Sequence, residues 1–99
     1  MPRRGGPRPG RRGRPRREVV VYTREGCGLC VVAEQLVARE ARGHHVRHVD
    51  VDRDPQLQRR YGVRVPVVTV DDVEVAELQV SPGEVRDGLA RFGDAGRPR

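Results

Sequence analysis

The two cysteines of this 99-residue chain are separated by only two residues, in the segment Cys27-Gly28-Leu29-Cys30. They follow a valine-rich run at residues 19–21, which predicts a strand, and they precede a segment with helical periodicity. A C-x-x-C pair at a strand-to-helix turn is typical of a thiol–disulfide site. The free N–H groups and the dipole at a helix start favour a thiolate, which is the reactive form of cysteine. The spacing therefore predicts a redox-active pair at the beginning of a helix.

The net positive charge of the chain comes from its first 17 residues. All 20 basic residues are arginines, against 14 acidic residues, which gives a net charge of +6. Eight of the arginines fall in residues 1–17, which contain no acid, so residues 18–99 carry 12 − 14 = −2. The segment 1–17 contains only Met, Pro, Arg and Gly, which cannot bury apolar surface, and we predict that it is disordered. Its arginines either bind nucleic acid through phosphate contacts or form a solvated extension.

The composition narrows the class of protein. Aromatic residues make up 3% of the chain, so a core must be built from Val, Leu and Ala, and the length allows one domain. No apolar run is long enough to cross a membrane, and residues 1–17 lack the apolar segment of a secretory signal. Two cysteines this close make a poor structural cross-link, which favours a reducing, cytoplasmic setting. We also expect a monomer.

Hydrophobic periodicity and turn residues predict seven elements in the order β-α-β-α-β-β-α. Residues spaced as on one face of a helix follow the cysteines, and we expect that face to be buried: Leu29, Val32, Ala33, Leu36 and Val37. The predicted strands are 19–23, 46–51, 65–70 and 73–75, and the predicted helices run from Leu29 to about 42, over 55–60, and from Pro82 to about Phe92.

The turns between these elements indicate the fold class. The first β-α-β unit implies parallel pairing, and Asp71-Asp72 suits the tight turn of an antiparallel hairpin. Asp54 is a predicted N-cap, and Ser81 with Glu84 fits a capping box before the last helix. We therefore predict an α/β domain over residues 18–92, with a mixed four-stranded sheet flanked by helices. Residues 93–99 are expected to fray.

Several segments together resemble a known family. The element order, the Cys pair after the first strand and Val65-Pro66 opening the third strand resemble the thioredoxin fold, and the compact form without an extra first strand looks like a glutaredoxin. The sequences of three segments are similar to those of short bacterial glutaredoxin-like proteins: Tyr22-Thr23-Arg24, Val49-Asp50-Val51-Asp52 and residues 60–68. The resemblance covers about residues 18–92.

The resemblance implies a thiol–disulfide oxidoreductase that acts on small or protein disulfides. Cys27 would be the nucleophile and Cys30 the resolving thiol. Pro66 would follow a cis peptide bond beside the pair, and the backbone of Val65 would bind an extended substrate as an added strand. No bound cofactor is implied, and the electron donor would be glutathione or a reductase. The Gly-Gly-Asp segment with which classical glutaredoxins hold glutathione is replaced here by the sequence of residues 76–82.

Two charged residues precede the pair. Glu25 disfavours a thiolate nearby, whereas Arg24 favours one, so the sequence does not predict which effect prevails.

A zinc site is the alternative for the cysteines. Cys27-x2-Cys30-x13-His44-x3-His48 is close to the spacing of zinc-finger ligands. However, a finger places its cysteines on a hairpin and its histidines on a helix, whereas here a helix is predicted between the pairs and the histidines begin a strand. We therefore predict no metal at the pair. The second functional class is a non-enzymatic protein that binds nucleic acid through residues 1–17, with the cysteines inert or zinc-bound.

Overall fold

The computed structural model describes residues 16–95, and the elements in it follow the predicted order with one addition. A short 3-10 helix, η1, which was not predicted, lies between the second strand and the second helix and includes Val51, the last residue of the predicted strand. The elements are β1 (Glu18–Thr23), α2 (Gly28–Glu40), β2 (His45–Asp50), η1 (Val51–Arg53), α3 (Pro55–Tyr61), β3 (Val67–Val70), β4 (Val73–Glu77) and α4 (Glu84–Ala95).

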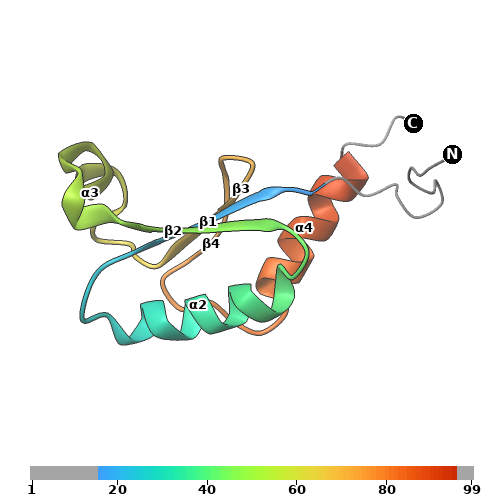
Figure 1. The fold of residues 1–99 in the computed structure, drawn as a ribbon, viewed down its shortest axis with the longest axis horizontal. Helices are drawn as coiled ribbons and strands as arrows, with labels where there is room; N and C mark the ends of the chain where they lie inside the picture. Colours follow the sequence, from blue (N-terminus) through green and yellow to red (C-terminus); the bar gives the residue numbers. More distant parts are fainter. Residues whose placement is uncertain (1–15, 96–99) are drawn as a thin grey trace, which may run out of the picture.

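The four strands form one mixed sheet in the order β2-β1-β3-β4 (Figure 1). β1 pairs with β2 in parallel, and β3 pairs antiparallel with both β1 and β4. Asp71 and Asp72, both with positive φ, form the tight turn between β3 and β4. The predicted α/β fold with a mixed four-stranded sheet is thus confirmed.

The helices cover the two faces of the sheet unequally. α2 and α4 pack on one face, over a core of valine, leucine and alanine that includes Val19 and Val21 of β1. α3 and η1 cover one end of the other face, over Val51, Tyr61 and Val67, against which Tyr22 packs. The alternation of Val21 and Tyr22 between the two faces is the ordinary period of a strand. Tyr22 stacks on Tyr61 with ring centroids 4.3 Å apart, which fixes α3 to the end of β1.

The buried face of α2 differs from the predicted one. Leu29 and Val32 are 45% and 46% exposed, whereas Cys30 is 2% exposed. The buried stripe instead consists of Cys30, Ala33, Leu36 and Val37. Ala33, Leu36 and Val37 were predicted correctly, but the stripe is rotated by about one residue at the beginning of the helix. The rotation at which α2 packs on the sheet places Cys30 rather than Leu29 at the inward position of the first turn.

Two predicted strands have different bounds in the structure: β2 is shifted by one residue towards the N-terminus, and β3 is two residues shorter. β2 ends at Asp50, because Val51 turns into η1, which Asp50 caps by accepting a hydrogen bond from the Asp52 N–H. β3 begins at Val67 rather than at Val65. Pro66 has no N–H to pair, and the Val65–Pro66 peptide bond is cis, as the family resemblance implied.

The last helix begins two residues later than predicted and extends further. Gly83 has φ +91, a left-handed conformation that cannot lie inside a helix, so α4 begins at Glu84 rather than at Pro82. Glu84 Oε1 accepts a hydrogen bond from the Ser81 N–H, which is one half of the predicted capping box. The helix continues to Ala95, beyond the predicted end at Phe92.

Arg17, which the composition assigned to the tail, contacts three parts of the domain. Its Nη1 donates to Asp71 Oδ2 at 2.9 Å, and its Nη2 donates to the Phe92 carbonyl at 3.4 Å. Its backbone N–H donates to His44 Nδ1, and its carbonyl accepts from the His45 N–H. Arg17 therefore ties the beginning of β1 to β2, to the β3–β4 turn and to α4.

Candidate active site

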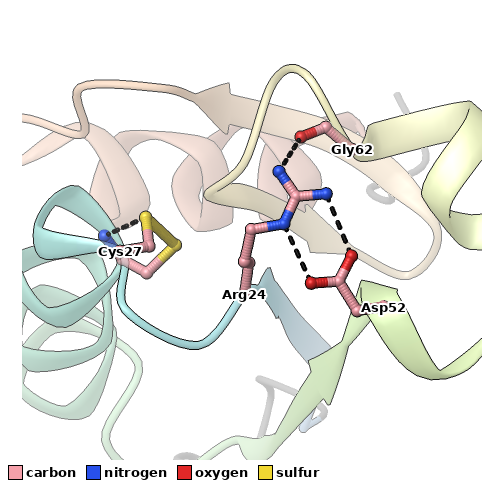
Figure 2. Close-up of a disulfide and its surroundings, with 5 residues drawn as sticks. Arg24, Cys27, Asp52 and Gly62 are labelled. Carbon is pink, nitrogen blue, oxygen red and sulfur yellow. Dashed lines mark hydrogen bonds and ion pairs between the residues drawn. A yellow bond between two sulfur atoms is a disulfide. The ribbon is translucent and has the colours of Figure 1, made fainter.

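Cys27 and Cys30 form a disulfide where the loop after β1 enters α2 (Figure 2). Their Cα atoms are 5.2 Å apart. Cys27 is the N-cap of α2 in an extended conformation, and Cys30 lies within the first turn of the helix. The loop leaves β1 at the carboxyl end of the strand, which is where open α/β sheets place their binding sites.

The first turn of α2 directs backbone N–H groups at Cys27. The N–H of Cys30 donates to Cys27 Sγ at 3.1 Å and to the Cys27 carbonyl, also at 3.1 Å. In the reduced protein, the same N–H group and the positive end of the helix dipole would stabilise a thiolate on Cys27. The role of Cys27 as the nucleophile stays a prediction, with which this geometry is compatible.

The two sulfurs differ in their access to solvent. Cys30 is buried, at 2% exposure, whereas Cys27 is half-buried and faces a groove. Both cysteines line the groove, but Cys27 offers more exposed surface than Cys30. This asymmetry is the one that an attacking thiol and a resolving thiol require.

An open groove of about 600 Å³ runs beside the disulfide. The groove is also lined by three charged residues that were not predicted as site residues: Glu34, Asp50 and Arg53. Glu34 could have been found from its spacing, because it lies four residues after Cys30 on the same side of the helix. Asp50 and Arg53 reach the groove only because β2 ends beside β1. The remaining lining residues are Thr23, Arg24, Glu25, Gly26, Cys27, Gly28, Cys30 and Val31.

Arg24 is bound to η1 and to Gly62, the C-cap of α3. Its Nε and Nη2 donate to the two carboxylate oxygens of Asp52, each at 3.0 Å, and its Nη1 donates to the Gly62 carbonyl at 3.0 Å (Figure 2). This pairing lowers the pKa of Asp52 and raises the pKa of Arg24, chiefly through the hydrogen bonds between them. The charge of Arg24 is therefore balanced by Asp52. Arg24 consequently offsets little of the unfavourable effect of Glu25 on a thiolate at the cysteines.

The structure places Val65 and Pro66 at the end of the sheet where the cysteine loop begins. β3 runs antiparallel to β1 with Tyr22 opposite Val67, so the residues just before β3 lie beside the residues just after β1. Pro66 is fully buried, and Val65 is half-buried. Within residues 16–95, the backbone of Val65 forms no backbone hydrogen bond. Neither residue lines the groove beside the disulfide, and their role in substrate binding stays a prediction.

The structure separates the residues of the zinc alternative along the chain. The cysteines lie at the beginning of α2, and His44 and His48 follow its end, so a helix of 13 residues separates them. At 1.5 Å per residue this helix is about 20 Å long, far beyond the span of one metal ion. In the described part of the chain, no three His, Cys, Asp or Glu side chains lie close enough together to hold a metal.

Two predictions concern the arginine-rich segment 1–17, namely its disorder and its binding to nucleic acid. Residues 1–15 of this segment lie outside the described residues, and only Arg16 and Arg17 are described. Nucleic-acid binding stays a prediction. No helix within residues 16–95 is both long enough and apolar enough to span a membrane.

The fold and the disulfide at the helix start define a thioredoxin-fold protein with a dithiol site. The model of the glutaredoxin-like domain family (DUF836) matches residues 18–90, and the chain belongs to this family. An uncharacterized protein of Mycobacterium tuberculosis is 36% identical over 83 residues, which covers 77% of this chain and 86% of the relative.

Two solved structures support the same fold. A structural genomics target protein from X. campestris is 28% identical, with a TM-score of 0.61, and the match covers 80% of this chain and 99% of that one. A mutant thioredoxin from Halobacterium salinarum is 26% identical, with a TM-score of 0.58, and the match covers 78% and 74% of the two chains. Together with the cysteine pair, these similarities support a redox role.

Proposed function

We propose that this protein is a dithiol–disulfide oxidoreductase in which Cys27 attacks and Cys30 resolves. The observation that carries the proposal is the Cys27–Cys30 disulfide at the N-terminus of α2, beside a groove, with Cys27 half-buried and Cys30 buried. Membership of the glutaredoxin-like family is consistent with it.

The reaction would proceed in two exchange steps. The Cys27 thiolate attacks one sulfur of a substrate disulfide, forms a mixed disulfide and releases the other substrate half as a thiolate. The Cys30 thiolate then attacks Cys27 Sγ, breaks the mixed disulfide and releases the second half. Two electrons pass to the substrate, and the protein is left with the Cys27–Cys30 disulfide.

We further propose that an extended substrate binds along the backbone of Val65, next to Pro66, as an added strand. The free backbone groups of Val65 and the position of β3 beside β1 support this assignment. Small and protein disulfides are the proposed substrates. Glutathione or a reductase would then reduce the pair, and the reaction would take place in the cytoplasm, where thiols are kept reduced.

A redox titration with two variants tests this function. The purified protein is equilibrated in buffers with a series of ratios of reduced to oxidised glutathione and is then alkylated. Mass spectrometry counts the thiols that were free. We expect both thiols to disappear together, with a midpoint within roughly −180 to −270 mV, the range of redox proteins. Cys27→Ser should abolish the reduction of insulin disulfides, whereas Cys30→Ser should retain the first step and accumulate the mixed disulfide.

The control is alkylation of the reduced wild type with limiting iodoacetamide. Cys27 should be modified before Cys30, because Cys30 is buried. Thiols that never oxidise in the titration, or a Cys27→Ser variant with unchanged activity, would refute the proposal.

A further inference from the structure

Arg24 connects two segments that the proposed reaction uses. It lies three residues before Cys27, and the carbonyl to which its Nη1 donates belongs to Gly62, three residues before Val65. Figure 2 shows the guanidinium between the cysteine loop on one side and Gly62 and Asp52 on the other. In the described chain, the hydrogen bonds of Arg24 are the only ones that join residues 24–27 to residues after β2.

The partners of Arg24 are themselves held in place. Asp52 Oδ1 also accepts a hydrogen bond from Gln58 Nε2 at 2.9 Å, which fixes the carboxylate from the side of α3. The hydrogen bonds from Arg24 lower the pKa of Asp52, so the carboxylate stays charged at neutral pH. A bidentate guanidinium–carboxylate pair fixes direction as well as distance.

The segment after α3 is fixed independently of Arg24. The Leu78 N–H donates to the Pro66 carbonyl at 2.7 Å and to the Arg64 carbonyl at 3.2 Å, which binds the residues on both sides of Val65 to the end of β4. The Arg64 N–H donates to the Tyr61 carbonyl at 2.8 Å. Cys27 itself is held to the first turn of α2 by the N–H groups of Cys30 and Val31. Among the described residues, Arg24 adds the direct hydrogen bond between the cysteine loop and the segment that leads to Val65.

We infer that Arg24 is a positioning residue that sets the spacing between Cys27 Sγ and the backbone of Val65, and that the site thereby favours extended polypeptide disulfides over small ones. This inference rests on the proposed function. A polypeptide must reach Cys27 and pair with Val65 at the same time, whereas a small disulfide needs only Cys27. A less rigid cysteine loop should therefore lower the rate constant for a polypeptide disulfide and leave the rate constant for a small disulfide unchanged.

The test compares two substrates that share a leaving group. One is a short linear peptide whose single cysteine is joined to thionitrobenzoate, and the other is 2-mercaptoethanol joined to thionitrobenzoate. The Cys27 thiolate attacks the peptide or mercaptoethanol sulfur and releases coloured thionitrobenzoate, after which Cys30 releases the peptide or mercaptoethanol thiol. Stopped-flow absorbance gives the first rate constant for each substrate with the reduced protein.

The main variant is Arg24→Lys, which keeps the positive charge and loses the bidentate fork. We expect the rate constant for the peptide to fall about tenfold or more, because small displacements of a reacting group cost rates of that order, with the rate constant for the small disulfide nearly unchanged. The matched control is Arg17→Lys at the opposite end of β1. Arg17 also donates to a carboxylate and to a backbone carbonyl, so the control loses similar contacts and should leave both rate constants unchanged.

Asp52→Asn is the second variant, and it carries the test if Arg24→Lys does not fold cooperatively. A loss confined to the peptide substrate in either variant supports the inference. An equal loss for both substrates, or no loss for either, overturns it. If the wild type releases thionitrobenzoate from neither substrate faster than Cys27→Ser does, the proposed function itself fails, which is a different result.

Discussion

The carboxylate of Glu40, at the end of α2, caps the beginning of α4 by accepting a hydrogen bond of 2.6 Å from the backbone N–H of Gly83. Its second oxygen accepts a hydrogen bond of 3.0 Å from the Arg86 N–H. Burial raises the pKa of Glu40, but the hydrogen bonds from these N–H groups outweigh it, and the net result is a lowered pKa. Glu40 thus satisfies unpaired N–H groups at the helix start and connects the two helices on the same face of the sheet.

We predict that Glu40→Gln destabilises the domain by about 1 kcal/mol, the usual cost of losing a good helix N-cap. The amide keeps the length of the side chain but offers a single, uncharged acceptor. The measurement is the urea unfolding midpoint, with the slope checked for two-state behaviour. Glu77→Gln is the control, because Glu77 is an exposed carboxylate outside the helix starts and pairs at the surface with Arg64. Equal midpoints for Glu40→Gln and the wild type would contradict the capping role.

The effect of Glu40 should depend on pH in a definite direction. Because its folded pKa is lowered, its contribution is complete above the unfolded value of about 4.3 and is lost as the pH falls through the folded pKa. The difference in unfolding free energy between the wild type and Glu40→Gln should therefore be constant near neutral pH and shrink in acid. Urea titrations over a series of pH values measure it. A difference that grows below pH 4 would have the wrong sign.

Gly88 lies where α4 packs closely against Val75 of β4. A Cβ at this position would lie 2.8 Å from Val75 Cβ and 3.0 Å from Val75 Cγ1. We predict that Gly88→Ala destabilises the domain by about 1–3 kcal/mol, because the overpacking outweighs the gain in helix propensity. Thermal unfolding measures the loss. The loss should be smaller in a Val75→Ala background, and a stabilised Gly88→Ala protein would show that α4 can move away.

The groove beside the disulfide should favour cationic disulfides. Glu25, Glu34 and Asp50 line it, the charge of Arg24 is matched by Asp52, and only Arg53 remains to oppose the three carboxylates. If the proposed exchange holds, the reduced protein should react with cystamine faster than with oxidised glutathione, after correction for the reactivity of each disulfide towards dithiothreitol.

Glu34→Gln should reduce the difference between the rate constants for cystamine and oxidised glutathione. Added salt should reduce the same difference in the wild type, because exposed charges are screened. The second-order rate constants at low and high salt measure both effects. A difference that is unchanged in Glu34→Gln and in salt would show that the groove charge plays no part.

The sequence determined the features that depend on near neighbours in the chain. The Cys27-x-x-Cys30 spacing at a strand end predicted the helix start and the disulfide site, and Asp54-Pro55 predicted the beginning of α3, where Asp54 Oδ1 accepts the Gln56 N–H. Alternating and helical periodicity gave the element order and the fold class. These features were predictable because each arises within a few residues of backbone geometry and hydrogen bonding.

The tertiary structure alone decided the features that join distant segments. The Arg24–Gly62 and Glu40–Gly83 hydrogen bonds span 38 and 43 residues, and no local pattern marks either pair. Asp50 and Arg53 reach the groove only because β2 lies beside β1, and Cys30 rather than Leu29 turns inward only because α2 packs at a particular rotation. Which side chains meet depends on how the sheet and helices pack, and that packing is a property of the whole chain.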